Sequence, residues 1–371
     1  MNYIDFFRLF FAFVTAFGIS LVAMPAIIRI ASIKMLTDPP DGERKFHKEV
    51  IPTLGGIGIF ASFLISFSIW GNAASLESYP FFVASLFMLF LIGIKDDVLI
   101  LSPIKKLIVQ IVAAAEIVMG GGIVLTNFGG VFGIYEIPYI AGVIISTLIF
   151  VILINSYNLI DGIDGLAAGT GIVVSGIAGP WFLASGFASM AILSFVLFGA
   201  LLGFLIFNFY PAKIFMGDTG AMAVGFILAY IIVQFITFNQ ANPEAAMYVE
   251  NPIVFAFALL IIPVADTLRV IVLRMLAGKN PLHADYNHMH HQFMKEGFLP
   301  STASVAIWMG NLWVVFLAYY LNFLEPTTQL VLVLAAGFGI HPFCKLVYYL
   351  LLKLVPADYS RIIMKLRIGN I

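Results

Sequence analysis

The chain has 371 residues, of which 61% are hydrophobic and only 11% are charged. A water-soluble globular protein of this length needs far more polar surface, so the composition excludes that class and predicts an integral membrane protein. The formal net charge is −1, but the charged residues gather in a few short stretches between long apolar runs. We expect a functional site in those stretches. The single cysteine, Cys344, lies in an apolar run, and alone it forms no intrachain disulfide.

Long apolar runs predict an all-α, polytopic membrane fold. A helix that crosses a bilayer needs roughly 20 apolar residues. Eleven segments meet or approach that length, at 6–30, 54–70, 80–94, 105–122, 139–155, 166–184, 189–208, 219–238, 252–273, 302–321 and 328–353. The segment 80–94 is short, so it is either tilted less than the others or extended into Lys95–Asp97. No repeat or linker divides the chain, and we expect one transmembrane domain over residues 1–371.

The positions of lysine and arginine predict the orientation, because short cytoplasmic loops retain positive charge. Alternate connections and the C-terminal tail carry Lys34, Arg44, Lys45, Lys48, Lys95, Lys105, Lys106, Lys213, Arg274, Lys279, Lys295, Arg361, Lys365 and Arg367. The intervening stretches 71–79, 123–138, 185–188, 239–251 and 322–327 contain neither residue type. We therefore expect the N-terminus outside and the C-terminus in the cytoplasm. Three glycines in the outer stretch 127–138 predict a small hairpin.

Aspartates gather on the predicted cytoplasmic face, whereas every acidic residue in the outer stretches is a glutamate. They lie at or beside helix ends, at Asp96, Asp97, Asp161, Asp164, Asp218 and Asp285. Short carboxylates on a stiff backbone suit a divalent cation. Asp96 and Asp97 are adjacent, so on a helix they point in different directions and only one faces a given ligand. The plainer interpretation of this pair is a helix-end charge cluster balanced by Lys95, Lys105 and Lys106.

A second polar stretch, residues 155–165, reads Asn-Ser-Tyr-Asn-Leu-Ile-Asp-Gly-Ile-Asp-Gly. Asn158, Asp161 and Asp164 recur every three residues, which on a helix would place successive members on one face. Such a face is costly near hydrocarbon unless a cation or a phosphate ligand compensates it. Gly162 and Gly165 leave room for something large beside the backbone. A glycine-containing turn with solvated side chains is the alternative.

A third stretch, residues 208–220, precedes the segment 219–238. Asp218 or Thr219 could serve only as the cap of that helix. However, Gly217 and Gly220 bracket the pair with open backbone, and a helix N-terminus beside a lysine is a natural place for phosphate. We favour a ligand site here.

The largest inner loop and the segment before it complete the polar pattern. Four of the six histidines fall within nine residues of this loop, at His283, His288, His290 and His291. A zinc site is conceivable from the spacing, but we favour hydrogen bonds to phosphate or sugar, and a solvated loop is the remaining interpretation. In the segment 252–273, Pro263 can kink the helix and free backbone carbonyls. We expect Asp266 to pair with Arg269, three residues further on.

Together, in this order and on this topology, the motifs resemble those of the polyprenyl-phosphate N-acetylhexosamine-1-phosphate transferases. The closest likeness is to the bacterial undecaprenyl-phosphate N-acetylglucosaminyl-1-phosphate transferase branch. The resemblance runs through Thr53–Gly56, Asp96–Asp97, Asn158–Gly165, Met216–Gly220 and His288–His291, and therefore covers most of the chain. Asn158–Gly165 and Met216–Gly220 are its most specific parts.

The resemblance implies a role for each matched residue. Asp218 matches the ligand of a Mg²⁺ ion, for which Mn²⁺ can substitute, and the resemblance implies that Asn158 or a neighbouring carboxylate is close to the same ion. Asp96 and Asp97 match paired aspartates implicated in metal binding and in positioning or deprotonating the lipid phosphate. Lys106 matches a basic residue that contacts the diphosphate.

The remaining matched residues lie around the donor. Asp161 and Asp164 match a loop beside the uridine and the metal, and His288, His290 and His291 match a motif thought to bind the sugar-phosphate. The implied enzyme belongs to the bacterial cytoplasmic (inner) membrane, has its active site on the cytoplasmic face, and uses UDP-N-acetylhexosamine and undecaprenyl phosphate. Its product would begin a cell-envelope polysaccharide. Nucleic acid is not an expected partner, and a homodimer is compatible with the sequence.

Two alternatives remain open at this stage. Within the family, the donor could be the UDP-N-acetylmuramoyl-pentapeptide used in peptidoglycan synthesis. In a different class, inner-face carboxylates could serve a cation-coupled transporter. Such a transporter usually has ionisable groups near the midplane and two related halves, whereas here the polar groups line one face. That arrangement favours an interfacial enzyme.

Overall fold

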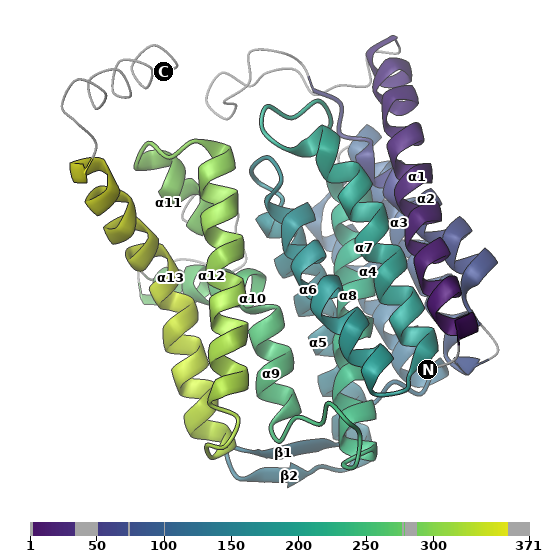
Figure 1. Ribbon diagram of the computed structural model, residues 1–371, viewed down its shortest axis with the longest axis vertical. Coiled ribbons are helices and arrows are strands. Elements are labelled where there is room, and N and C mark those ends of the chain that lie inside the picture. The colour runs from purple at the N-terminus through teal and green to yellow at the C-terminus, as the bar shows by residue number, and fades with distance from the viewer. Residues whose placement is uncertain are drawn as a thin grey trace.

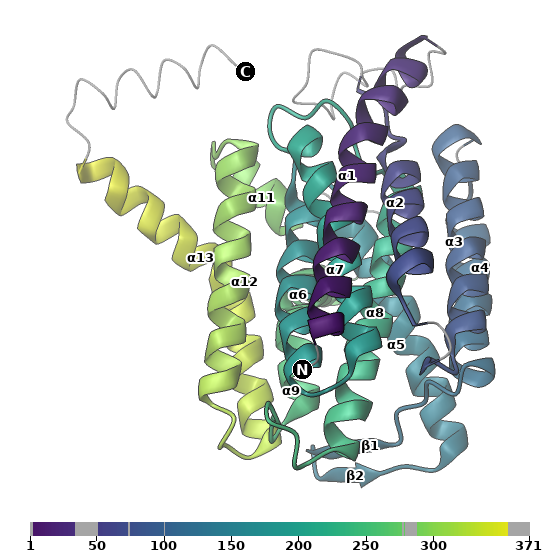
Figure 2. The same ribbon diagram turned by 45° about the vertical axis from the view of Figure 1, so that its right-hand side comes forward.

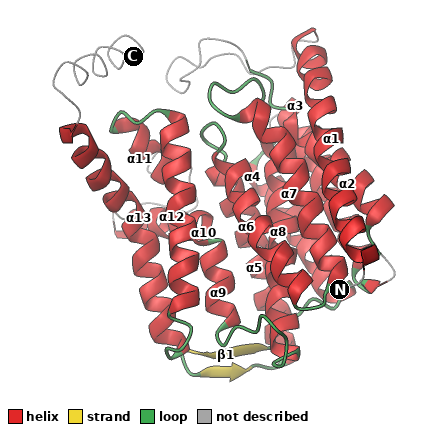
Figure 3. Cartoon of the chain, in the orientation of Figure 1, coloured by secondary structure: helices red, strands yellow, loops and turns green. Residues whose placement is uncertain are grey.

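The computed structural model describes residues 3–33, 51–72, 75–99, 101–276, 278 and 288–354, and within these the chain is almost entirely helical (Figure 3). The helices are α1 (Tyr3–Ile33), α2 (Gly55–Trp70), α3 (Tyr79–Leu99), α4 (Pro103–Ala115), the π-helical turn η2 (Glu116–Gly120), α5 (Tyr139–Ile160), α6 (Leu166–Ala184), α7 (Ala188–Asn208), α8 (Gly217–Ala241), α9 (Pro252–Leu259), α10 (Ile261–Leu276), α11 (Met289–Lys295), α12 (Pro300–Tyr320) and α13 (Pro326–Leu354). The strands are β1 (Asn127–Val131) and β2 (Ile134–Glu136).

Most of the long helices run side by side as a bundle (Figures 1 and 2). Each of the predicted apolar segments coincides with one helix or with two consecutive ones. Among the described residues, 7 helices are long and apolar enough to cross a membrane, and the bent pair α9–α10 would make 8. The seven are α1, α5, α6, α7, α8, α12 and α13. The protein is therefore an all-α, polytopic membrane protein, as predicted.

Helix α8 forms the centre of the bundle. In its most apolar window 83% of the residues are buried, compared with 22% in α1 and 17% in α13. It packs against α3 and α5 on one side and against α2 and α6 on others. The N-terminal turn of α8, which carries Asp218, is therefore held from several directions, whereas α1 and α13 lie at the periphery.

Two local predictions are confirmed. The segment 80–94 is extended, because α3 continues through Lys95–Asp97 to Leu99. The stretch 127–138 forms an antiparallel hairpin from β1 and β2, at the lower end of the bundle in Figure 1, the end at which α1 begins. Gly129, Gly130 and Gly133 have positive φ angles, which a glycine adopts at little cost.

The segment 252–273 is broken, in agreement with the proline that it contains. Helices α9 and α10 meet at Leu260 with a bend of 82°. Pro263 has no N–H to donate to the carbonyl of Leu259, four residues earlier. Instead, Asn311 Nδ2 of α12 donates to that carbonyl at 3.3 Å. The side chain of Asn311 thus partly satisfies the group that the proline leaves unpaired.

Candidate active site

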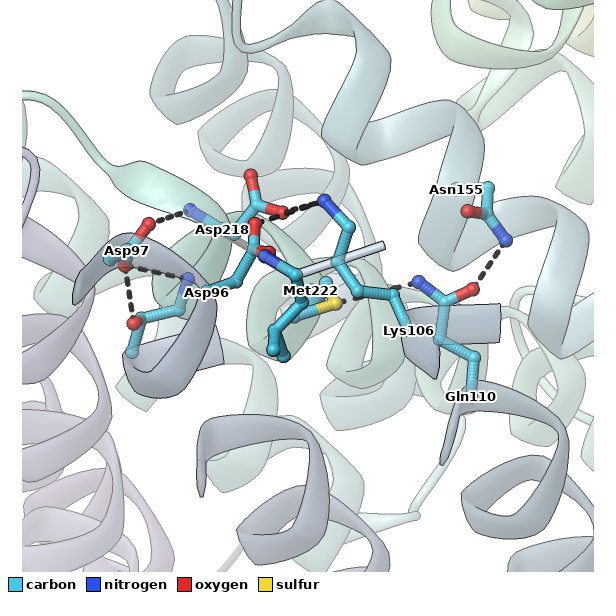
Figure 4. Close-up of polar contacts among 9 residues, drawn as sticks. Asp96, Asp97, Lys106, Gln110, Asn155, Asp218 and Met222 are labelled. Carbon is cyan, nitrogen blue, oxygen red and sulfur yellow. Dashed lines mark hydrogen bonds and ion pairs between the residues drawn. The ribbon is translucent and has the colours of Figure 1, made fainter. Parts of the chain in front are cut away.

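Asp97 of α3 caps the N-terminus of α8. Its carboxylate accepts hydrogen bonds from the backbone N–H groups of Asp218 at 2.8 Å and Thr219 at 3.1 Å, and from Thr219 Oγ1 at 2.5 Å (Figure 4). These N–H groups belong to the first turn, where the helix itself supplies no acceptor. A negative charge there also lies at the positive end of the helix dipole. Capping of α8 therefore comes from another helix.

Asp96 points elsewhere, as expected for its neighbouring position, and forms an ionic cluster with α4 and α8. Lys106 Nζ donates to Asp96 Oδ2 at 3.0 Å and to Asp218 Oδ2 at 2.6 Å. The side chains of Asp96, Lys106 and Asp218 are 12%, 24% and 24% exposed, so the cluster is open to a ligand at one end of the bundle. In Figure 4, dashed lines join the ammonium to both carboxylates.

The Thr53–Gly56 motif supports this cluster from the side. Gly55 and Gly56 donate backbone hydrogen bonds to the carbonyls of Phe215 and Met216, at 3.0 and 2.9 Å. Gly217 has a φ of +68°, and a Cβ there would lie 2.1 Å from the carbonyl oxygen of Thr53. Only glycine fits this combination of backbone angle and space. The motif thus fixes the entry of the chain into α8.

The prediction that Asn158, Asp161 and Asp164 share one face of a helix is wrong. Helix α5 ends at Ile160, Asp161 follows it with φ −77° and ψ 47°, and α6 begins only at Leu166. Gly165 adopts a φ of +78°, which favours a turn over a continuing helix. The three side chains consequently belong to a helix end and a loop, which is close to the alternative interpretation of this motif.

Within this loop, Asp164 is buried and holds the loop in place. Its Oδ2 accepts a hydrogen bond from the backbone N–H of Ala212 at 2.9 Å. Asn208 links the same two loops, because it accepts from the N–H of Gly165 at 3.0 Å and donates to the carbonyl of Ile214 at 2.9 Å. These contacts give Asp164 a structural partner in the α7–α8 connection.

Asp161 is directed into the negative cluster. Burial raises the pKa of its carboxyl group to about 7, and the charges of Asp218, Asp97 and Asp164 contribute, against a lowering by the N–H of Gly217. A carboxyl group whose pKa rises among like charges marks an excess of negative charge that a cation would relieve. Asp161 therefore belongs to the same site as Asp96, Lys106 and Asp218.

The histidine motif is attached to α10 through Asp266. Its carboxylate bonds to His288 Nδ1 at 2.9 Å, to the N–H of Met289 at 2.7 Å and to the guanidinium of Arg269 at 3.0 Å. The predicted pairing of Asp266 with Arg269 is confirmed. The contact with His288 was not predicted, because nothing in the sequence relates the two residues. It makes Asp266 the residue that fixes the start of α11.

His290 lies against the α5–α6 loop. It is 2% exposed, and a Cβ added to Gly162 would lie 2.2 Å from its Nε2. Burial, reinforced by the charge of His291, lowers the pKa of His290 to about 3, so the ring is neutral near pH 7. The histidine motif and the carboxylate cluster thus meet at Gly162. His283 and Asp285 lie outside the described residues.

No group of three or more His, Cys, Asp or Glu side chains that could hold a metal ion occurs among the described residues. At the carboxylate cluster, the ammonium of Lys106 is bonded to both Asp96 and Asp218. Among the described residues, the histidine motif forms no such group either, so the zinc site considered for it gains no support. The cluster offers oxygen donors, which suit Mg²⁺ better than zinc.

The structure therefore brings Asp96, Asp97, Lys106, Asp161 and Asp218 together, and places His290 beside them through Gly162. Asn158 lies in the last turn of α5, two residues before its end, and is half-buried. Sequence reasoning missed Asp266 as a partner of His288, and it assigned nothing to Gln110 of α4, which bonds to Asn155 of α5 at 2.6 Å (Figure 4). A glutamine inside a predicted span was the available signal for the second contact.

Comparisons with known proteins identify the family of this chain. Residues 79–236 match the sequence model of glycosyl transferase family 4. The chain is 30% identical over 311 residues to a probable undecaprenyl-phosphate N-acetylglucosaminyl 1-phosphate transferase of Bacillus subtilis, covering 81% of this chain and 82% of the relative. It is 29% identical over 307 residues to the undecaprenyl-phosphate alpha-N-acetylglucosaminyl 1-phosphate transferase of Yersinia pestis, covering 81% and 80% of the two chains.

A relative from another group of bacteria is similar to the same extent. It is the decaprenyl-phosphate N-acetylglucosaminephosphotransferase of Mycolicibacterium smegmatis, 29% identical over 313 residues that cover 79% of this chain and 76% of the relative. These matches extend over most of both chains and include all the elements that carry the ionic cluster. The protein thus belongs to the polyprenyl-phosphate N-acetylglucosamine-1-phosphate transferases of glycosyl transferase family 4.

Proposed function

We propose that this protein transfers N-acetylglucosamine-1-phosphate, or a close N-acetylhexosamine-1-phosphate, from the UDP-sugar to undecaprenyl phosphate and releases UMP. The observation that carries this proposal is the ionic cluster of Asp96, Lys106 and Asp218, with Asp97 and Asp161 beside it, at one end of a membrane-embedded bundle. A phosphate group on a membrane lipid and a water-soluble nucleotide can meet at such a boundary. The names of the relatives support the same pair of substrates.

The residues of the cluster have separate tasks in this reaction. An oxygen of the lipid phosphate attacks the β-phosphorus of the donor, and the bond from that phosphorus to the oxygen bridging to UMP breaks. Phosphoryl transfer depends mainly on charge neutralisation and alignment. Lys106 supplies positive charge at the diphosphate, and Asp96 holds Lys106 in place. The lipid phosphate has a second pKa of about 6, so it is largely dianionic near neutral pH and needs a positioning group more than a base.

We also propose that Asp218 and Asn158 hold a divalent cation, Mg²⁺ or in its place Mn²⁺. Carboxylate and amide oxygens are the donors that such ions prefer. Burial, together with the charges of neighbouring carboxylates, raises the pKa of Asp161 to about 7, which supports a cation in this region. When bound, the ion would neutralise charge on the diphosphate and on the departing UMP. His290, being neutral, would act as a hydrogen-bonding group and not as a counter-charge.

The test of the proposed function is an assay of UMP release. Purified protein receives undecaprenyl phosphate, Mg²⁺ and, in separate reactions, UDP-N-acetylglucosamine, UDP-N-acetylgalactosamine or UDP-N-acetylmuramoyl-pentapeptide. We expect the fastest release from an N-acetylhexosamine donor, loss of release with a chelator, and recovery with added Mg²⁺ or Mn²⁺. Faster release from the muramoyl-pentapeptide donor would favour the peptidoglycan enzyme, and no release from any donor would reject the transferase.

We further propose that all eleven predicted segments cross the bilayer of the bacterial cytoplasmic membrane, with the N-terminus outside and the cluster on the cytoplasmic face. The distribution of lysine and arginine supports this orientation. In a Cys344→Ala background, Lys295→Cys should react with a membrane-impermeant thiol reagent only after the cells are permeabilised. Glu244→Cys should react in intact cells. Both residues are exposed at these positions. The opposite labelling pattern would invert the topology and move the site to the outer face.

A further inference from the structure

A second polar layer lies one helical turn below the ionic cluster, inside the bundle. Gln110 of α4 is 1% exposed and bonds to residues of α5 and α8. Its Oε1 accepts a hydrogen bond from Asn155 Nδ2 of α5 at 2.6 Å, and its Nε2 donates to Met222 Sδ of α8 at 3.4 Å. Gln110 thus connects three helices through its two amide atoms, as Figure 4 shows.

Each member of this layer is one turn away from a residue of the proposed site on the same helix. Gln110 is four residues after Lys106, Met222 is four residues after Asp218, and Asn155 is three residues before Asn158. Residues at these spacings lie one above the other on a helix face. The contacts of Gln110 therefore fix the distances between the helices at the level of the site.

We propose that Gln110 is a positioning residue of the transferase, which sets the placement of Lys106 relative to Asp218 and Asn158. This inference rests on the proposed function of these three residues. Neither Gln110 nor Asn155 touches the ionic cluster through a hydrogen bond, so both act through the helices that they join. A displacement of about 1 Å at a catalytic group can cost on the order of a hundredfold in rate.

The polarity of Gln110 supports a specific role over simple filling of space. A buried amide is costly unless it is hydrogen-bonded, and an apolar side chain of similar size would pack there without that requirement. The contact with Asn155 also engages the amide of a second, half-buried polar side chain, whose Nδ2 additionally donates to the carbonyl of Val151 at 2.8 Å. Such a pair holds one relative position of α4 and α5, because a shift of either helix breaks it.

The experiment compares Gln110→Leu, Asn155→Leu, the double variant, and the exchanged pair Gln110→Asn with Asn155→Gln. UMP release from UDP-N-acetylglucosamine is measured as kcat and KM, and thermal unfolding is measured in detergent. Gln329→Leu is the matched control. Gln329 is also buried and joins two helices, through its bond to the Ala318 carbonyl at 2.6 Å, but it lies in the first turn of α13, at the end of the bundle opposite the cluster.

We expect Gln110→Leu to lower kcat at least about tenfold, the double variant to be no worse than the more impaired single variant, and the exchanged pair to recover most of the loss. Gln329→Leu should keep its kcat even if its unfolding temperature falls. Gln110→Leu with wild-type kcat, an equal loss in Gln329→Leu, or an exchanged pair no better than the single variants would overturn the positioning role. A wild-type protein that releases no UMP would instead reject the proposed function, and the positioning role with it.

Discussion

Replacing Asp218 with asparagine is expected to lower UMP release by on the order of 10³-fold while the protein stays folded. The substitution keeps the shape of the side chain but removes the charge that we assign to the divalent cation, and losses of this size follow the removal of one such electrostatic group. The fold should survive, because Lys106 keeps its bond to Asp96 and Asp97 still caps α8. UMP release at saturating Mg²⁺ measures the first effect, and thermal unfolding in detergent measures the second.

Glu244→Gln is the control for this variant. It removes one carboxylate charge from an exposed residue in the connection between α8 and α9. This connection follows the C-terminal end of α8, whereas the cluster lies at the N-terminal end of that helix. Its activity should equal that of the unaltered protein. An Asp218→Asn protein with near-normal, Mg²⁺-dependent release would exclude Asp218 from the site.

Replacing Lys106 with methionine is expected to lower kcat by about 10²- to 10³-fold. The ammonium is bonded to Asp96 and Asp218 at 3.0 and 2.6 Å, so its loss leaves two carboxylates facing each other and removes the positive charge proposed for the diphosphate. Methionine keeps the length and the apolar stem of the side chain. Steady-state UMP release, with the donor and the lipid varied separately, measures the effect.

The neighbouring Lys105 provides the control, since it is exposed and has the same stem and charge. Lys105→Met should retain its activity within about twofold, because an exposed charge at a membrane boundary interacts mainly with water and salt. If both lysine variants lose activity equally, the effect stems from the general positive charge of this face. In that case the specific position of Lys106 between the carboxylates is unimportant.

Sequence patterns predicted the helical segments and most members of the site because both leave strong local signals. Long apolar runs identify helices directly, and aspartates at their ends stand out against apolar surroundings. The pattern also indicated that Asp96 and Asp97 would point apart. The direction of each was not predictable, since it depends on where α4 and α8 pack against α3.

The failures have a common physical origin in backbone and tertiary contacts. The spacing of Asn158, Asp161 and Asp164 favoured a helix, but α5 ends at Ile160. The φ of +78° at Gly165, where the loop enters α6, is invisible to a periodicity argument. The bond between Asp266 and His288 joins residues that are 22 positions apart in the sequence. Asp266 could be identified as the partner of His288 only from the packed structure.

The capping of α8 by Asp97 has a consequence for how the protein is made. The two partners are 121 residues apart, and a nascent chain folds from its N-terminus. In the proposed topology, α3 would therefore enter the membrane well before α8 is synthesised. During that interval the backbone N–H groups of α8, which later donate hydrogen bonds to Asp97, do not yet exist. An unpaired carboxylate is costly inside hydrocarbon but tolerable at the membrane surface, where water solvates it. Its position in the last turn of α3 therefore lets an unfinished chain remain inserted until α8 arrives and completes the site.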